Sequence, residues 1–411
     1  MNEPKLRFKA DDGSQFPDWE EKTLGDIGTA KMCKRVLKEQ TSEKGDVPFY
    51  KIGTFGGTPD AFISRELYEE LKTKYSFPRK GNILLSAAGT IGRTVVYDGQ
   101  DAFFQDSNIV WLDNDDSVLD GFLLQFYNKT SWDNLEGGTI KRLYNGLFLS
   151  KVIHVPSLPE QQKIAEFLST IDTVIEKQKE TVSAWEERKK GVMQKLFSQE
   201  VRFKADDGSE FPEWEEKSFS DVFENLNNST FSRDCLNYET GNVKYIHYGD
   251  ILIKFGFVID VQSSNVPYVN EDLNCEKYAS LSEGDIVIAD TAEDDTVGKA
   301  VEVMNTHWGK TISGLHTIAC HPMGKFASKY LGYFMNSDIY HNQLRPYMQG
   351  IKVTSVSKTN IALTKILVPC LVEQQKIADC LSALDEVIEK QKATLAAWEE
   401  LKKGLLQQMF V

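Results

Sequence analysis

Two long segments of the chain place apolar side chains at alternating spacings of four and three residues. The first seam, within residues 156–200, contains Ile164, Leu168, Ile171, Ile175, Val182 and Trp185. The second, within 369–411, contains Ile377, Leu381, Leu384, Ile388, Leu395 and Trp398. This heptad pattern is typical of helices that pack along their length. Each segment therefore predicts one long helix, and these residues form the predicted core of a helix pair.

The segments between the helices show a different pattern. Short β-rich runs alternate with polar turns at 82–86, 94–98 and 108–112, and again at 285–290, 299–303 and 316–320. Residues 119–128 have helical periodicity instead. Runs of this length and composition predict short strands. We therefore expect a mixed α/β fold with a small curved sheet in each of these two segments.

An internal repeat organises the whole chain. Residues 7–22 recur at 202–217 with changes only at Gln15/Glu210 and Asp18/Glu213, and residues 160–197 recur at 373–410 with 25 of 38 positions identical. The intervening segments have diverged strongly. We therefore divide the chain into an N-terminal constant segment (1–22), a first variable domain (23–155), a central helix (156–200), a repeated constant segment (201–217), a second variable domain (218–368) and a C-terminal helix (369–411).

The repeat also predicts how the two copies are related. A pseudo-two-fold axis across the helices requires them to pack antiparallel. The first helix leads directly into the second RFKADDG segment, so the second helix should end beside the first such segment. This cyclic arrangement predicts that Phe8 and Phe410 are neighbours although they lie near opposite ends of the chain.

Composition and charge narrow the class of protein. The chain has 411 residues, is 41% hydrophobic and carries a formal net charge of −14. We find no apolar run of membrane-spanning length, no apolar N-terminal stretch and no CxxC spacing among the six cysteines, and therefore expect a cytoplasmic protein with reduced thiols. Residues 23–155 carry 16 basic and 17 acidic residues, 218–368 carry 12 and 17, and the remaining segments carry 19 and 27. Most of the acidic excess thus lies outside the variable domains.

Basic residues in the variable domains lie mainly at turns and strand ends, beside glycine and with Asn, Gln and Tyr interleaved. Such residues suit contacts to phosphates and base edges. The predicted DNA-binding residues are Lys31, Lys34, Arg35, Lys51, Thr54, Arg79, Lys80, Arg93, Lys141, Arg142, Arg233, Lys244, His247, Asp250, Lys254, Lys299, Lys310, Arg345 and Lys352. Lys51 aligns with His247 and Thr54 with Asp250, and residues that select different sequences should differ at matched positions. A charged surface without a ligand remains the alternative for each residue.

Catalytic signatures are missing from the sequence. The glycines show no phosphate-loop or dinucleotide-binding context, and His316 and His321 have no further ligand at metal-binding spacing. No Ser/His/Asp set can be identified. We therefore predict no catalytic residue, no metal site and no cofactor in this chain.

The repeated motifs resemble those of a known family. A proline followed by EQQKIA and a long heptad helix with D-x-V-I-E-K-Q-K and W-E-E-x-K-K-G, duplicated around two divergent domains, resembles the DNA-specificity (S) subunit of type I restriction-modification enzymes. The resemblance covers essentially the whole chain. It implies a non-catalytic subunit in which each variable domain is a target-recognition domain that reads one half of a bipartite, asymmetric site in double-stranded DNA. The helices would set the distance between the half-sites.

The resemblance also implies partners. Two modification subunits would bind S-adenosylmethionine and methylate adenine, and two restriction subunits using ATP and Mg²⁺ can join them. The implied docking residues for the modification subunits are Glu160, Gln161, Gln162, Ile164, Glu373, Gln374, Gln375 and Ile377. Two alternatives remain open at this point: an acidic coiled-coil adaptor, and a DNA mimic whose carboxylates imitate phosphates.

Overall fold

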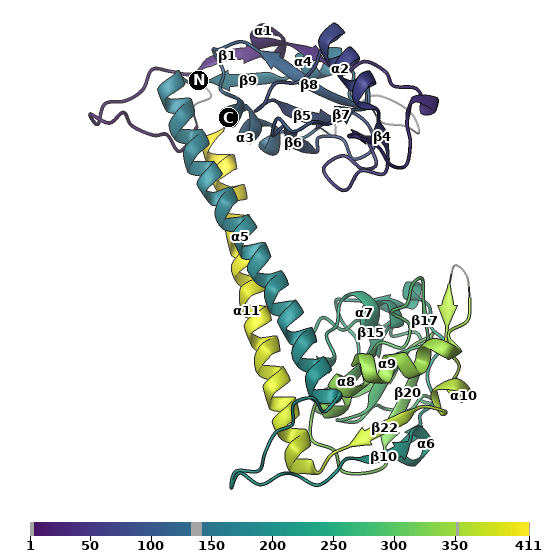
Figure 1. The fold of residues 1–411 in the computed structure, drawn as a ribbon. Coiled ribbons are helices and arrows are strands. Elements are labelled where there is room, and N and C mark those ends of the chain that lie inside the picture. The colour runs from purple at the N-terminus through teal and green to yellow at the C-terminus, as the bar shows by residue number, and fades with distance from the viewer. Residues whose placement is uncertain (1–3, 133–141, 351–352, 411) are drawn as a thin grey trace. The chain divides into compact units, whose positions relative to one another are not determined.

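The computed structural model describes residues 4–132, 142–350 and 353–410. The chain divides into unit 1, residues 1–180 with 393–411, and unit 2, residues 181–392. Each unit contains one variable domain together with part of both long helices (Figure 1). The two units are described separately below.

Unit 1 is built on an antiparallel four-stranded sheet with the strand order β2-β8-β5-β6. These strands are β2 (Gly28–Lys31), β8 (Ile109–Asn114), β5 (Ile83–Ser86) and β6 (Thr94–Val96). A three-stranded sheet follows the order β4-β3-β7, with β4 at Phe62–Ile63, β3 at Val47–Tyr50 and β7 at Phe103–Phe104. The strands β1 (Glu20–Thr23) and β9 (Val152–Val155) pair antiparallel. The strands predicted over 82–86, 94–98 and 108–112 are confirmed as β5, β6 and β8.

Helices complete unit 1, and one of them packs the sheet against a long helix. They are α1 (Leu24–Ile27), η1 (Lys38–Gln40), α2 (Arg65–Lys74), α3 (Asp120–Lys129), α4 (Asn145–Leu149) and the first part of α5 (Leu158–Phe197). Phe122 and Leu123 of α3 share a buried cluster with Leu168 and Ile171 of α5. Burial of apolar side chains is the dominant favourable term in folding, so this cluster holds the variable domain to the long helix.

Unit 2 repeats the plan with additional strands. Its main sheet has the order β11-β20-β16-β18-β14. The strands are β11 (Phe223–Asn225), β20 (Thr317–Pro322), β16 (Ile286–Ala289), β18 (Ala300–Met304) and β14 (Val258–Asp260). A second sheet joins β12 (Leu236–Asn237), β15 (Tyr268–Val269), β13 (Val243–Ile246) and β19 (Lys310–Ser313), and two further pairs are β10 (Glu215–Ser218) with β22 (Lys365–Val368) and β17 (Thr291–Ala292) with β21 (Thr354–Ser355). The strands predicted over 285–290, 299–303 and 316–320 are confirmed as β16, β18 and β20.

Short helices cover this second domain. They are α6 (Phe219–Val222), η2 (Arg233–Cys235), α7 (Tyr248–Ile253), η3 (Thr306–Trp308), α8 (Tyr330–Met335), α9 (Asp338–Leu344), η4 (Arg345–Tyr347) and α10 (Lys358–Ile361). Helix α8 is buried along its whole length and packs in one core with Leu381 of the long helix α11 (Leu371–Met409). The predicted mixed α/β class is therefore confirmed in both variable domains.

The long helices run antiparallel within each unit, as predicted. In unit 1, Asp172 and Lys179 of α5 pair with Lys402 and Glu399 of α11, so the partner numbers fall as the α5 numbers rise. In unit 2, Glu186 pairs with Lys392 at 2.9 Å and Lys189 with Asp385 at 2.6 Å, in the same sense. Of the seam residues, Leu384, Leu395, Trp185 and Trp398 are half-buried and the other eight are buried.

The predicted cyclic closure is also confirmed. Phe8 packs against the buried cluster of unit 1 that contains Phe410. The Leu6 amide donates a hydrogen bond to the Gln408 carbonyl at 3.0 Å. The last turn of α11 thus lies beside the first constant segment, as the repeat requires. Within the described ranges, no helix combines the length and apolarity that crossing a membrane demands.

Candidate nucleic-acid interface

Two glycine-containing turns of unit 1 meet at one small cleft. The first turn follows β3 and closes with a hydrogen bond from the Thr54 amide to the Lys51 carbonyl at 3.0 Å. Gly92 in the second turn has φ +89°, and a Cβ there would lie 2.3 Å from the Trp132 ring, so only glycine fits. Arg93 joins the turns by donating to the Phe55 carbonyl at 2.8 Å. The cleft of about 210 Å³ is lined by Ile52, Gly53, Phe55, Ser86, Gly89, Thr90 and Arg93.

Further polar side chains border these turns. Gln105 accepts a hydrogen bond from the Ile52 amide at 2.8 Å, and Arg142 donates to the Ser107 carbonyl at 2.7 Å. Lys51 is partly exposed and pairs with Asp60 at 2.9 Å. Of the predicted residues, the structure thus connects Lys51, Thr54 and Arg93 through one pair of turns. Arg142 is tied to the loop that precedes β8.

The matching turn of unit 2 carries a different polar network. Asp250 in α7 is 1% exposed and accepts hydrogen bonds from both terminal nitrogens of Arg233, at 2.8 and 3.0 Å. Lys254 pairs with the same carboxylate at 3.0 Å. The Tyr238 hydroxyl accepts from Arg233 at 2.9 Å and from Lys254 at 2.7 Å. Because Arg233, Lys254 and Tyr238 are substantially exposed, the network presents donors to solvent above a buried carboxylate.

His247 is the residue before α7, and its uncharged imidazole accepts a hydrogen bond from the backbone of this turn. Its Nδ1 accepts a hydrogen bond from the Gly249 amide at 3.0 Å, and its ring stacks on Tyr248 at 4.7 Å. Burial first, and then the charge of Arg233, lowers the pKa of His247 from 6.5 to about 4. The imidazole is therefore uncharged at neutral pH.

This pKa predicts an acid-sensitive stability. Between pH 6.5 and 4 the unfolded chain binds a proton at His247 that the folded chain does not bind, so stability is full above pH 6.5 and falls toward pH 4. His247→Asn keeps an acceptor for the turn and should reduce this loss. Urea denaturation between pH 4 and 7 measures the effect, with the exposed His307→Asn as a control. An unchanged pH dependence in His247→Asn would contradict the assignment.

Three predicted DNA-binding residues require correction because they are buried. Lys244 is 5% exposed and donates to the Val261 carbonyl beneath the Tyr268 ring, while Asp250 and His247 are 1% and 7% exposed. Lys299 is half-buried and donates to the Leu252 and Phe255 carbonyls, which matches the contact of Arg93 to Phe55. These residues shape the turns of their domains. The sequence pattern could not separate them from surface residues, because a buried lysine looks the same in the sequence.

The remaining predicted residues are dispersed. Arg79 and Lys80 border a cleft with Asp115, Asp116 and Asp120, which disfavours a phosphate. The other contacts are Arg35 with Asp106, Lys34 with the Tyr75 ring, Lys310 with the Cys275 carbonyl and Arg345 with Asp295, while Lys31 ends β2. Lys141 and Lys352 lie outside the described residues.

Sequence reasoning missed several polar residues at these turns. Gln105 and Ser107 border the unit 1 turns, and Tyr238, Tyr248 and His316 border the unit 2 network. His316 has φ +55° and packs edge-on against Tyr248 at 5.3 Å. Tyr248 begins helix α7 and the other four lie in loops between elements, but none is a lysine or arginine, the residue types on which the sequence prediction mainly rested.

The EQQK block of α5 is fastened to the first constant segment. Glu160 is fully buried and accepts two hydrogen bonds from Arg7, at 3.1 and 2.8 Å, and one from the Trp19 indole at 3.1 Å. Gln161 accepts from the Leu119 amide and donates to the Ser117 and Pro156 carbonyls. Unit 2 repeats this arrangement around Glu373, Arg202 and Trp214 and around Gln374. We call each Glu–Arg–Trp set a lock.

These contacts show that the prediction of a docking surface was wrong for most of its residues, because they are buried. Glu160, Gln161, Ile164, Glu373, Gln374 and Ile377 are all buried at 0–1% exposure inside the chain. A residue with no exposed surface cannot dock a second protein without local unfolding. Only Gln162 and Gln375 of the expected set are exposed, and both donate to an acidic residue one turn along the helix.

The two histidines considered as metal ligands lie apart from any cluster of possible ligands in residues 4–132, 142–350 and 353–410. No three His, Cys, Asp or Glu side chains in these ranges gather closely enough to hold an ion. His316 and His321 pair instead with Asp290 and Asp285.

Comparison with known proteins identifies the family. The type I restriction modification DNA specificity domain matches residues 17–183 and 212–397. A putative type I restriction enzyme specificity subunit of Haemophilus influenzae is 56% identical over 152 residues, which cover 37% of this chain and 40% of the relative. The putative MjaX specificity subunit of Methanocaldococcus jannaschii is 24% identical over 97% of this chain and 94% of the relative.

Solved structures share the fold over nearly the whole chain. The type I S subunit of M. genitalium aligns with a TM-score of 0.56 and 16% identity, covering 100% of this chain and 99% of that one. A chain from a structural study of type I complex assembly aligns with a TM-score of 0.52 and 15% identity, covering 96% of this chain and 97% of that one.

The protein described here belongs to the type I restriction-modification DNA-specificity family. It is a specificity subunit, the non-catalytic component that recognises the DNA sequence.

Proposed function

We propose that each variable domain reads one half of a bipartite, asymmetric sequence in double-stranded DNA through its glycine-containing turns. Residues 23–155 and 218–368 are the two target-recognition domains in this proposal. Segments 1–22, 156–200, 201–217 and 369–411 form the frame that holds them and sets the distance between the half-sites.

One observation supports this proposal: the two copies of the frame repeat the same lock contacts, while the turns of the two variable domains differ. The Arg–Glu bonds measure 3.1 and 2.8 Å in both locks. The turn after β3 presents Lys51 and Thr54, whereas in unit 2 Arg233, Tyr238 and Lys254 gather around Asp250 of the matching turn. Two copies of one frame carrying different donors suit the reading of two different half-sites.

The charge distribution suits a chain that binds DNA together with its partner subunits. Both variable domains are neutral to acidic overall, so phosphate attraction must come from local cations. We therefore expect weak, strongly salt-dependent binding by the chain alone and tighter binding when modification subunits supply further basic surface.

The partner assignments follow from the family. We propose two modification subunits that carry S-adenosylmethionine and two optional restriction subunits that use ATP and Mg²⁺. Gln162, Gln375 and the exposed faces of α5 and α11 form the proposed docking surface for the modification subunits. No cofactor is assigned to this chain.

The direct test is genome-wide mapping of adenine methylation in cells that carry the modification subunits, with and without this chain. The proposal expects methylation at one bipartite sequence only when the chain is present. A coiled-coil adaptor would change no methylation pattern, and a DNA mimic would inhibit DNA binding by the modification subunits. Either outcome would overturn the proposal.

Lys51 provides a test at a single residue. Lys51→Ala should weaken binding of the assembled complex by about 5- to 150-fold, the range that one good base contact of about 1–3 kcal/mol represents. Titration of duplexes that differ only in the first half-site measures the loss. Lys74→Ala is the matched control, since Lys74 is an exposed lysine in the same ion-pairing state on α2. Equal affinities of wild type and Lys51→Ala would remove Lys51 from the interface.

A further inference from the structure

A carboxylate on one long helix of each unit is shared with the neighbouring long helix and with the variable domain. In unit 2, Asp385 of α11 accepts a hydrogen bond from the Lys189 ammonium of α5 at Oδ1, at 2.6 Å. Its other oxygen accepts from the Tyr333 hydroxyl of α8, also at 2.6 Å. One side chain therefore connects both long helices to the domain, and we call this set of three residues the joint of unit 2.

The surroundings restrain the joint. Lys189 is only 13% exposed, and its ammonium lies 4.4 Å from the Phe257 ring centroid and 5.2 Å from that of Tyr333. Tyr333 is buried and also lies 3.3 Å from the Ser382 hydroxyl. A cation enclosed by two aromatic faces and a carboxylate has little freedom to choose another partner.

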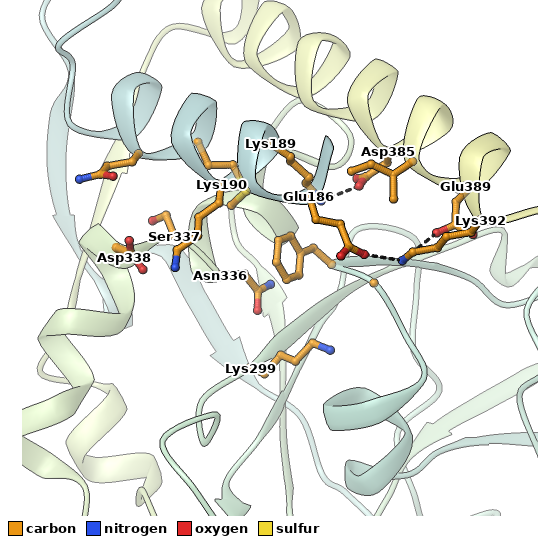
Figure 2. A pocket seen from close by; sticks show the side chains of 15 residues that line it. Glu186, Lys189, Lys190, Lys299, Asn336, Ser337, Asp338, Asp385, Glu389 and Lys392 are labelled. Carbon is orange, nitrogen blue, oxygen red and sulfur yellow. Dashed lines mark hydrogen bonds and ion pairs between the residues drawn. The ribbon is translucent and has the colours of Figure 1, made fainter. Parts of the chain in front are cut away.

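A cavity of about 480 Å³ borders the joint. Figure 2 shows Lys189 and Asp385 directed toward each other along the helix side of the cavity, with Lys299 and Asn336 on the domain side. The cavity lies between the long helices and the domain, and beside it α8 packs in one core with Leu381 of α11. Where this core meets the cavity, Asp385 adds directional bonds to the apolar contacts.

Unit 1 contains the same joint with a different domain residue. Asp172 of α5, the repeat counterpart of Asp385, pairs with Lys402 of α11. Its second oxygen accepts from the Gln125 amide of α3 at 3.0 Å. Gln125 is 1% exposed and its Oε1 has no partner among the described residues, so the bond from its amide nitrogen to Asp172 is the polar contact that orients it. The helix residues are identical in both joints, while the domain residue is an amide in one and a phenol in the other.

We propose that Asp172 and Asp385 are positioning residues that fix the orientation of each recognition domain on the helix pair, and through it the spacer length between the half-sites. The inference rests on the proposed function and deepens it. Apolar burial is non-directional and tolerates sliding, whereas a charged hydrogen bond at each carboxylate oxygen depends on angle. A domain that can rotate should accept half-sites at more than one spacing.

The experiment uses the full chain assembled with modification subunits on a DNA library in which the spacer varies one base pair at a time. For Asp385→Asn and Tyr333→Phe, the ratio of methylation at the preferred spacer to that at its neighbours should fall about five- to tenfold, as expected for one lost hydrogen bond. Asp385→Glu keeps both acceptor oxygens and should restore most of the ratio. Lys179→Gln is the control, because the ion pair of Lys179 with Glu399 joins α5 to α11 and includes no domain residue.

The outcomes separate the two proposals. A wild-type spacer ratio in Tyr333→Phe, or an equal loss of methylation at all spacers, would overturn the positioning role, since simple destabilisation gives the latter. If the wild-type chain confers no selective methylation, the proposed function fails. Hydrogen exchange then decides on the joint: faster exchange of α8 amides in Tyr333→Phe supports it, and unchanged exchange overturns it.

Discussion

Glu373→Ala should lower the unfolding temperature of unit 2 by about 6–20 °C. The fully buried carboxylate accepts from Arg202 and Trp214, and removing it leaves a guanidinium without its main acceptor. Breaking a buried pair in this way costs about 3–5 kcal/mol. In a domain of this size each kcal/mol shifts the midpoint by about 2–4 °C.

Differential scanning calorimetry of the full chain measures this shift, and the repeat supplies the controls. Glu160→Ala should produce the same effect in unit 1, because its lock has the same bonds. Asp206→Asn removes an exposed partner of Lys376 a few residues from the lock and should leave the midpoint unchanged. If Glu373→Ala and Asp206→Asn unfold at the same temperature, the lock does not hold the constant segment in place.

The lock explains why the sequence revealed the frame so clearly. RFKADDG, the following tryptophan and EQQK are distant in sequence but contact one another, so each repeat copy retains all of them. Heptad spacing and the two offsets were therefore enough to predict antiparallel helices and the packing of Phe8 against the cluster that contains Phe410. The function of the block was not readable in the same way: Glu160 and Gln161 have the polar side chains of a docking surface, yet they are buried by segments more than 40 residues away.

The recognition turns were harder to predict for a related reason. A lysine near a glycine turn suggests phosphate contact, but the ammonium groups of Lys244 and Lys299 donate hydrogen bonds to backbone carbonyls of their own domain. Whether a turn residue faces DNA depends on tertiary pairing that local patterns do not encode. Tyr238 shows the reverse case, since it becomes a candidate only because Arg233 and Lys254 converge on its hydroxyl.

Asp250→Asn should destabilise unit 2 by about 2–3 kcal/mol at pH 7. Breaking a fully buried pair would cost more, but Arg233 and Lys254 remain 43% and 46% exposed, so solvent screens part of the loss. The same variant releases both cations from their fixed positions in the proposed recognition surface. DNA affinity of the assembled complex for the second half-site should therefore fall about tenfold, which corresponds to roughly 1.4 kcal/mol.

The pH dependence gives this prediction its sharpest test. Burial raises the pKa of Asp250, but hydrogen bonds and charge from Arg233 and Lys254 outweigh it and leave the pKa lowered. The stability from this carboxylate is thus present above the unfolded pKa of about 3.9 and is lost as the pH falls through the lower folded value. The difference in unfolding free energy between wild type and Asp250→Asn should be largest at pH 7 and should shrink below about pH 4. Urea midpoints at pH 7 and pH 3 measure this difference, with the exposed Asp272→Asn as control. Acid removes the charge of Asp250 but not its packing. An equal difference at both pH values would therefore show that Asp250 acts by packing rather than by charge.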